Sequence, residues 1–369
     1  MRHCDKKAVT VNVTNRCNLR CVYCMASSAK EQNNPKDIDI DFALKGISDA
    51  IKGYPTGIPA TILRFFSPGE PTQRMDIIRT CVEYAKLLNK NIKVEIQTNG
   101  VFESKEDLEW IKDNVDVVWF SLDGWAEIND ANRPDANGVG RTSDAEQNMK
   151  YLQYAGVFVG VRSTINGDMF YRQTELVEYY NKLGIKYICL NPITVPVVRG
   201  DTKKRTVYKD NIMDWAKGFA DAFEVAESLG CVLSSSLTFN FDEKTNVSCR
   251  ACLPMPQLNC DGSVSSCDKA TYRDTKKGLD CFLYGEWDKE TRTIVYDMEK
   301  IDYLRNRIVE NMPKCRNCSV ADYCAGNCAG RIAYESGDIY EVIDEHCDAI
   351  KYLASRLPLG RQIVEFTHP

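Results

Sequence analysis

Residues 9–24 read VTVNVTNRCNLRCVYC, a strand-like alternation that ends at Thr14 and is followed by three cysteines. Cys17, Cys21 and Cys24 are spaced Cys-x3-Cys-x2-Cys on a loop directly after the predicted strand. Structural zinc prefers four protein ligands in paired knuckles, whereas a cubane iron–sulfur cluster takes one cysteine per iron. Spacing and position favour the cluster over a zinc knuckle or buried cysteines. Three thiolates then leave one iron open, and an open iron implies chemistry at iron.

The residues around these cysteines, from Thr14 to Cys24, resemble the signature of radical S-adenosylmethionine (SAM) enzymes. The resemblance implies that the open iron chelates the amino acid end of SAM. In that family the reduced cluster passes one electron to the sulfonium, and the resulting 5′-deoxyadenosyl radical abstracts a hydrogen atom from substrate. The cofactor supplies the difficult step, while the protein orients it and keeps water out.

Length and composition indicate an ordinary globular chain. Its 369 residues, 44% hydrophobic and 27% charged, suffice for one large domain and a smaller one. There is no run of about 18 apolar residues and no secretion signal before the first strand, which predicts a cytoplasmic protein without a membrane partner. The net charge of -5, with both signs interspersed, predicts no nucleic-acid partner.

Strand-like and helix-like patterns alternate six times from residue 9 to residue 229. After the first strand, strands are predicted at 60–66, 92–97, 116–122, 157–165 and 186–190, and helices at 41–52, 73–88, 105–114, 143–154, 173–183 and 211–229. Such alternation favours parallel strands with right-handed crossovers. We therefore predict an α/β fold whose residues 1–240 form a partial (β/α)6 TIM-type barrel, with its site at the carboxyl ends of the strands.

Short polar residues follow several of these strands, and the family resemblance assigns them to the cofactor. Pro68-Gly69-Glu70-Pro71 resembles the family's Gly-Gly-Glu-Pro turn, with Pro68 in place of a glycine; proline stiffens the turn and removes one N–H. Asn-Gly and Asp-Gly sequences are also ordinary turn formers, so both interpretations stay open. The SAM-binding residues implied by the resemblance are Tyr23, Gly69, Glu70, Thr98, Asn99, Ser121, Asp123, Arg162 and Asn191.

A second cysteine array fills residues 241–369 and resembles the SPASM extension of radical SAM enzymes. The resemblance implies two auxiliary [4Fe-4S] clusters, three in all, the nearer held by Cys249, Cys252, Cys267 and Cys328 and the farther by Cys315, Cys318, Cys324 and Cys347. Cys260 is an alternative to Cys249, and without Cys249 one iron would be open to a substrate sulfur. Zinc knuckles are the other interpretation of the array. The sequence Cys260-Asp261-Gly262-Ser263-Val264 predicts a hairpin.

Two additional clusters imply a route for a second electron, and hence a two-electron oxidation. SPASM relatives carry this out on peptides and proteins, forming formylglycine or crosslinks, and a minority act on small molecules such as aminocyclitols. A small-molecule dehydrogenase or epimerase is therefore one alternative. A non-enzymatic electron carrier is another, although it would not account for the polar strand ends. We expect an external electron donor such as flavodoxin or ferredoxin, and no peptide-recognition domain before the barrel.

Asp268 directly follows Cys267 and is the candidate catalytic residue. In sulfatase-maturating relatives an aspartate at the matching position removes the substrate's thiol or hydroxyl proton. A carboxylate beside a negatively charged cluster is expected to have a raised pKa, which would suit a base near neutral pH. The alternative is that Asp268 only ends a hairpin strand.

Overall fold

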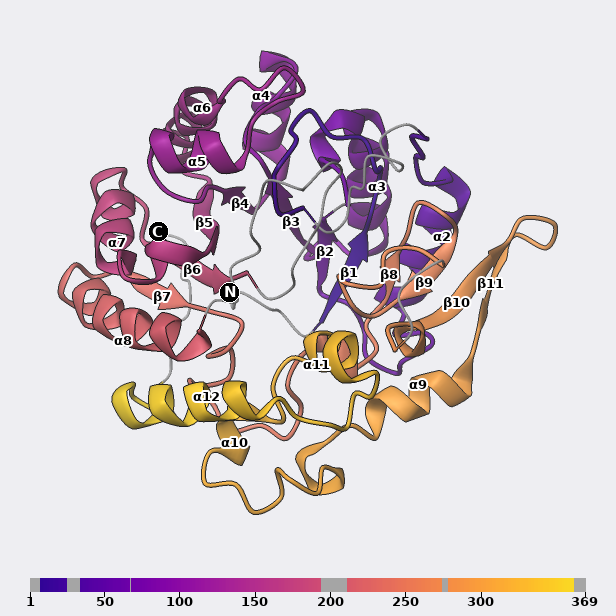
Figure 1. The fold of residues 1–369 in the computed structure, drawn as a ribbon. Coiled ribbons are helices and arrows are strands. Elements are labelled where there is room, and N and C mark those ends of the chain that lie inside the picture. The colour runs from indigo at the N-terminus through magenta and orange to yellow at the C-terminus, as the bar shows by residue number, and fades with distance from the viewer. Residues whose placement is uncertain (1–6, 25–33, 67, 194–210, 274–277, 362–369) are drawn as a thin grey trace.

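The computed structural model describes residues 7–24, 34–66, 68–193, 211–273 and 278–361. Seven parallel strands form its centre, in the spatial order of the chain, with helices on their outer side (Figure 1). These strands are β1 (Ala8–Val11), β2 (Ile62–Phe65), β3 (Lys93–Thr98), β4 (Val117–Ser121), β5 (Phe158–Ile165), β6 (Tyr187–Pro192) and β7 (Val232–Ser234). The predicted partial barrel is thus confirmed, and β7 adds a parallel strand that the sequence analysis did not predict.

The covering helices lie where the alternation predicted them. They are α2 (Ile40–Ile51), α3 (Met75–Leu88), α4 (Lys105–Asn114), α6 (Thr142–Tyr154), α7 (Gln173–Lys182) and α8 (Ile212–Ser228). Asp39 caps α2 by accepting from the N–H groups of Asp41 and Phe42, and Ser104 caps α4 by accepting from that of Asp107. A short helix, α5 (Ala126–Asn132), was not predicted, because its seven residues carry no apolar periodicity.

The inner face of the barrel sheet is polar where the strands approach the site. All four residues of β1 are buried, and the same holds for β2. Val9 and Val11 alternate with Thr10 and Asn12, and Arg64 on β2 is also buried. Buried polar groups cost stability unless they are paired, so this face is built for specific hydrogen bonds rather than for packing alone.

The second cysteine array continues the same sheet. Strand β8 (Gln257–Leu258) pairs in parallel with β1, and β9 (Ser263–Ser265), β10 (Leu283–Asp288) and β11 (Thr293–Tyr296) follow in antiparallel order. The predicted hairpin joins β8 to β9 and turns at Gly262, whose φ of 85° favours glycine. The two predicted domains, residues 1–240 and 241–369, therefore share one eleven-stranded sheet, whose hydrogen bonds cross the boundary between them.

Four further helices complete the carboxyl-terminal part: α9 (Met298–Arg305), α10 (Ala321–Cys324), α11 (Ala329–Ser336) and α12 (Asp344–Arg356). Helix α12 packs against α8, which joins this part to the outer layer of the barrel. None of the helices in the described part of the chain is long and apolar enough to cross a membrane.

Candidate active site

The cysteine loop, residues 17–24, follows β1 and is held by the turn after β2. The Glu70 N–H donates to the Arg16 carbonyl at 2.6 Å. Gly69 lies against the same backbone, since a Cβ built there would come within 2.0 Å of the Arg16 oxygen. The pKa of the Cys17 thiol is raised, mainly by burial. The neighbouring Cys21 raises it further, and Cys24 adds a smaller effect. The three cysteines are thus close enough to interact, and glycine is required where the turn supports them.

Glu70 is buried and its carboxylate is engaged within the protein. One oxygen accepts from the Thr72 N–H at 3.2 Å, the Thr72 hydroxyl at 2.9 Å and the Thr98 hydroxyl at 2.8 Å, and the other accepts from the Asn99 N–H at 2.7 Å. Burial raises the pKa of Glu70, although these donors lower it in part. In this arrangement Glu70 ties the turn after β2 to the end of β3. Its expected role in binding SAM stays a prediction.

Asn99 continues this support to the cysteine loop. Its side-chain N–H donates to Asn18 Oδ1 at 2.7 Å, and Asn18 in turn donates to the Val101 carbonyl at 2.8 Å. Asn99 Oδ1 accepts from the Val101 N–H at 2.9 Å. The polar residues after β3 therefore position the loop that carries the cysteines.

Asp123, after β4, is fully buried and binds the last part of the same loop. The Tyr23 hydroxyl donates to Asp123 Oδ2 at 2.5 Å, and Arg133 Nε donates to that oxygen at 3.2 Å. Oδ1 accepts from the Thr164 N–H at 2.9 Å. Arg133 also points Nη1 at Cys21 Sγ, 3.7 Å away. Sequence reasoning missed Arg133, because it caps the carboxyl end of α5, a helix that was not predicted.

The remaining predicted cofactor residues lie on β4, β5 and β6. Ser121 is paired in register with Arg162, and Arg162 donates to the side-chain oxygen of Gln97 on β3. Asn191 donates to Cys189 Sγ at 3.1 Å and accepts from the Ser236 N–H at 2.8 Å. The structure therefore brings Arg162 beside β3 and β4, and its binding of SAM stays a prediction.

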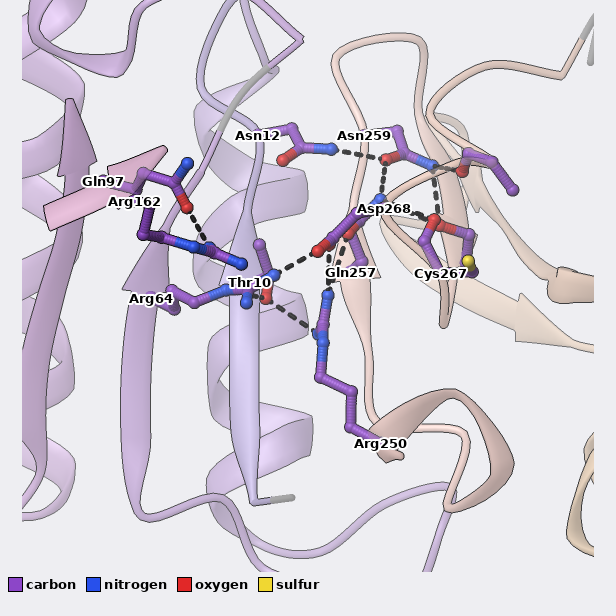
Figure 2. A network of polar contacts seen from close by, with 12 residues as sticks. Thr10, Asn12, Arg64, Gln97, Arg162, Arg250, Gln257, Asn259, Cys267 and Asp268 are labelled. Atoms are coloured by element: carbon purple, nitrogen blue, oxygen red, sulfur yellow. Dashed lines mark hydrogen bonds and ion pairs between the residues drawn. The ribbon is translucent and has the colours of Figure 1, made fainter. Parts of the chain in front are cut away.

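Asp268 lies in the barrel interior at the centre of a polar network (Figure 2). Its Oδ1 accepts from Arg64 Nη2 at 2.7 Å and from Arg250 Nη2 at 2.5 Å. Both arginines also donate to the Thr10 hydroxyl. The Asp268 side chain keeps 35% of its surface exposed, whereas the two arginine side chains are almost completely buried. One oxygen of Asp268 is therefore held by two arginines, Arg64 on β2 and Arg250 in the segment before β8.

The expectation of a raised pKa for Asp268 is wrong for this structure. Burial acts to raise the pKa, but Arg64, Arg250 and Arg162 together outweigh it, and the pKa of Asp268 lies well below its usual range. The sequence argument considered only the cluster beside Cys267. Arg64 was hidden in a strand pattern and Arg250 was a spacer between two cysteines.

Amide side chains connect β1 to this network. Asn12 donates to Asn259 Oδ1 at 2.8 Å, and Gln257 donates to the same oxygen at 3.2 Å and to the Cys267 carbonyl at 3.3 Å (Figure 2). Gln257 Oε1 accepts from Arg250 at 3.0 Å. The strand before the cysteine loop and the segment carrying Cys267 are thus joined by buried hydrogen bonds.

The first predicted auxiliary ligand set, here called the Cys249 group, comprises Cys249, Cys252, Cys267 and Cys328. Its members interact with one another: Cys249 hydrogen-bonds to Cys252, and the charges of Cys328 and Cys249 raise the pKa of the Cys267 thiol after burial. The hydrogen bond from Cys249, with help from Arg307, lowers the pKa of Cys252 to about 6. Cys249 and Cys328 also line one small cavity.

The second predicted set, here called the Cys315 group, comprises Cys315, Cys318, Cys324 and Cys347. All four line a single cavity of about 470 Å³ between α10 and α12. A cavity of this size walled by four thiols fits a bulky sulfur-bound group. Within the described residues, no three His, Cys, Asp or Glu side chains converge tightly enough to hold a single metal ion.

Cys260 is directed elsewhere. Its thiol is buried and donates to the Asn12 carbonyl at 3.0 Å. The thiol of Cys260 thus links the segment after β8 to the end of β1. This geometry favours Cys249 over Cys260 as the ligand. The stretch 195–209, which the sequence suggested as a loop over the site, lies outside the described residues, as do Cys4 and Ser67.

Comparison with known proteins agrees with this geometry. Residues 11–183 match the family model described as the Radical SAM superfamily. An uncharacterised protein of Methanocaldococcus jannaschii is 34% identical over 184 residues, 49% of this chain and 61% of that protein. A cysteine-type anaerobic sulfatase-maturating enzyme of Clostridium novyi is 25% identical over 328 residues, 85% of each chain. The solved structure titled native anSMEcpe with bound AdoMet and Kp18Cys peptide has a TM-score of 0.71 at 18% identity, covering 95% of this chain and 96% of that one.

The three cysteines lie on the loop after the first strand of a parallel barrel sheet, and the family match falls on this same region. Residues 11–183, slightly less than half of the chain, match the radical SAM superfamily model. Over nearly its whole length the fold is similar to that of anSMEcpe.

Proposed function

We propose that this chain is a SAM-dependent oxidoreductase that modifies a peptide or protein side chain, by formylglycine-type oxidation or by crosslinking. SAM bound at a cluster on Cys17, Cys21 and Cys24 would supply a 5′-deoxyadenosyl radical that removes a substrate hydrogen atom. The observation that carries the proposal is the division of eight further cysteines into two groups, one of which includes Cys267, the residue before Asp268.

The donor set of the cysteine loop fits the first cluster. Three thiols lie together on one short loop, and no fourth thiol is contributed by its sequence. The loop is braced on three sides, by Gly69 and Glu70, by Asn99, and by Asp123 through Tyr23. Such support keeps reactive groups within the narrow geometry that their chemistry needs.

The Cys249 group and the Cys315 group are proposed to hold two auxiliary clusters that receive the second electron. Eight thiols can cap two cubanes completely. An electron donor such as flavodoxin or ferredoxin would supply the first electron. Zinc in these groups is the competing interpretation, and metal analysis separates the two.

Asp268 is proposed to face the substrate. Its Oδ1 is fixed by Arg64 and Arg250, and its side chain is a third exposed toward the barrel interior. The ionised carboxylate then accepts a hydrogen bond, and finally the proton, from a substrate thiol or hydroxyl. The low pKa makes it a weaker base than the sequence argument assumed, so positioning rather than basicity would carry its contribution.

A peptide substrate is supported by two relatives. The Clostridium novyi relative is named a sulfatase-maturating enzyme, and anSMEcpe was solved with a peptide and AdoMet. The eightfold cysteine array, with Asp268 beside Cys267, covers the part of the chain beyond the family match, so the proposal does not rest on the radical SAM domain alone.

Reconstituted protein is the direct test. We expect about twelve irons per chain, falling to about eight when Cys17, Cys21 and Cys24 are replaced by Ala. With SAM and a strong reductant the wild type should release 5′-deoxyadenosine and methionine, and the triple variant neither. A cysteine-containing peptide should then be oxidised. Iron near four per chain, or stoichiometric zinc, would refute the auxiliary clusters.

If no peptide is oxidised, the behaviour of SAM separates the two alternative functions. SAM cleavage without any peptide product would favour the small-molecule alternative, a dehydrogenase or epimerase. Binding of SAM with no cleavage under any condition would favour an electron carrier.

A further inference from the structure

Arg307, in the segment after α9, is completely buried. Its guanidinium group makes hydrogen bonds to neutral oxygens: Nε donates to the Ile339 carbonyl at 2.5 Å, Nη2 to the Gly326 carbonyl at 2.6 Å and Nη1 to the Ser248 hydroxyl at 3.1 Å. These bonds use all three nitrogens of the group, but within the described residues they leave its charge without a counter-ion.

No carboxylate compensates this charge in the part of the chain that the structure describes, where none forms an ion pair with Arg307 within 4.0 Å. A buried charge that lacks a partner destabilises the folded state. The chain would therefore be expected to place an anion here, and the nearest candidates are sulfur atoms.

The position of Arg307 relates it to both cysteine groups. Nη1 points at Cys252 Sγ, 3.9 Å away, and at the Asn327 carbonyl, 3.4 Å away. Gly326 and Asn327 lie between Cys324 of one group and Cys328 of the other. The guanidinium group also acts electrostatically on Cys249 and on Cys315. One buried cation thus stands between the two sets of thiols.

We propose that Arg307 is the counter-charge shared by the Cys249 group and the Cys315 group, and that it raises the reduction potential of the cluster held by Cys252. This inference rests on the proposed function, which supplies the two auxiliary clusters. Net charge and hydrogen bonds to sulfur set the potential of an iron–sulfur cluster, and a nearby positive charge favours the reduced form, which carries one more negative charge. Arg307 acts through the cluster ligands and is a positioning residue, not a catalytic one.

The test is a redox titration of reconstituted Arg307→Met, which keeps a long apolar side chain and removes the charge. We expect full iron content and one auxiliary cluster whose midpoint potential, followed by electron paramagnetic resonance, falls by at least about 59 mV, a tenfold change in the one-electron equilibrium constant. Arg307→Lys should stay close to the wild type, because it keeps the charge. The matched control is Arg305→Met. Arg305 lies two residues before Arg307, and its charge is paired with Asp302.

A second readout needs no cluster. Metal-free Arg307→Met should unfold at a lower temperature than metal-free wild type, because the carbonyl groups of Ile339 and Gly326 lose their buried donors. Reconstitution should then stabilise the wild type more than the variant. If Arg307→Met does not retain iron, Arg307→Gln replaces it in the titration, since glutamine is neutral and keeps N–H donors.

Two results would overturn the inference in distinguishable ways. Wild type with about twelve irons and an unchanged potential in the neutral variant would refute the role of Arg307 alone. Wild type with about four irons would refute the auxiliary clusters and, with them, this role.

Discussion

Gly69→Ala is the substitution for which the structure gives the sharpest prediction. The added Cβ would lie 2.0 Å from the Arg16 carbonyl oxygen and 2.5 Å from the Asn15 carbonyl carbon. Both are backbone atoms, so no side-chain rotation relieves the contact. The turn after β2 and the cysteine loop would have to separate by roughly 1 Å, which is the kind of overpacking that costs about 1–3 kcal/mol.

The separation also removes a hydrogen bond. The Glu70 N–H donates to the Arg16 carbonyl at 2.6 Å, and its loss adds about 1 kcal/mol. We therefore expect the free energy of unfolding to fall by about 2–4 kcal/mol. Because Cys17 is the next residue after Arg16, the first cluster should be lost selectively.

The assay combines thermal unfolding of the metal-free protein with iron analysis after reconstitution. Gly69→Ala should bind about eight irons instead of about twelve and cleave little SAM. Gly57→Ala is the matched control: Gly57 has a φ of 73° and nothing within 4 Å of an added Cβ, so it tests backbone strain of about 1–2 kcal/mol without a clash. Unchanged stability and full iron in Gly69→Ala would show that the loop does not depend on this contact.

Three other substitutions test the site. Tyr23→Phe keeps the ring but removes a donor from buried Asp123, so the free energy of unfolding should drop by about 1–3 kcal/mol, as measured by chemical denaturation; an unchanged value would mean that Asp123 does not need the bond. Asp37→Asn tests pH dependence. Burial raises the pKa of Asp37, but Thr14, Arg16 and Arg74 outweigh this effect and hold the pKa below 3.8. The ionised carboxylate therefore stabilises the fold by roughly 1 kcal/mol above pH 3.8, and this stabilisation is lost as the pH falls through the lower pKa of the folded state. The difference between wild type and variant should therefore be constant near pH 7 and disappear in acid, and a difference that grows in acid would contradict this sign. Asp268→Asn should keep its iron and its SAM cleavage while product formation falls by about two orders of magnitude, whereas full product formation would exclude Asp268 from the mechanism.

The barrel was predictable because its elements repeat a strong local pattern. Strands β2 to β6 are short apolar runs separated by amphipathic helices, and each was placed within a few residues. Strand β8 has only two residues, Gln257 and Leu258, and no local pattern predicts its pairing with β1. Such pairing depends on the tertiary structure, because the register is set by contacts between distant segments.

The cysteine ligands could be proposed from the sequence for a similar reason, since ligand spacing is local, and their metal binding stays a prediction. Their supporting residues could not be proposed in this way. Glu70 and Asp123 were expected to face the cofactor, yet in the structure both bind the protein itself. Arg250 and Arg307 gave no signal because an arginine near cysteines is usually a solvated surface residue. Only the fold reveals that these side chains are buried.

The pairing of β1 with β8 sets a condition on synthesis. Asn12 and Asn259 are 247 positions apart, so the inner edge of β1 stays open until the carboxyl-terminal third of the chain has been made. At about 5–20 residues per second this interval lasts roughly 10–50 s. During that time the cysteine loop is already outside the ribosome, while β1 can pair with β2 but still lacks β8 on its other side. Iron delivered before β8 is made would meet three thiols beside an incomplete sheet, so we expect metal loading to follow the synthesis of β8.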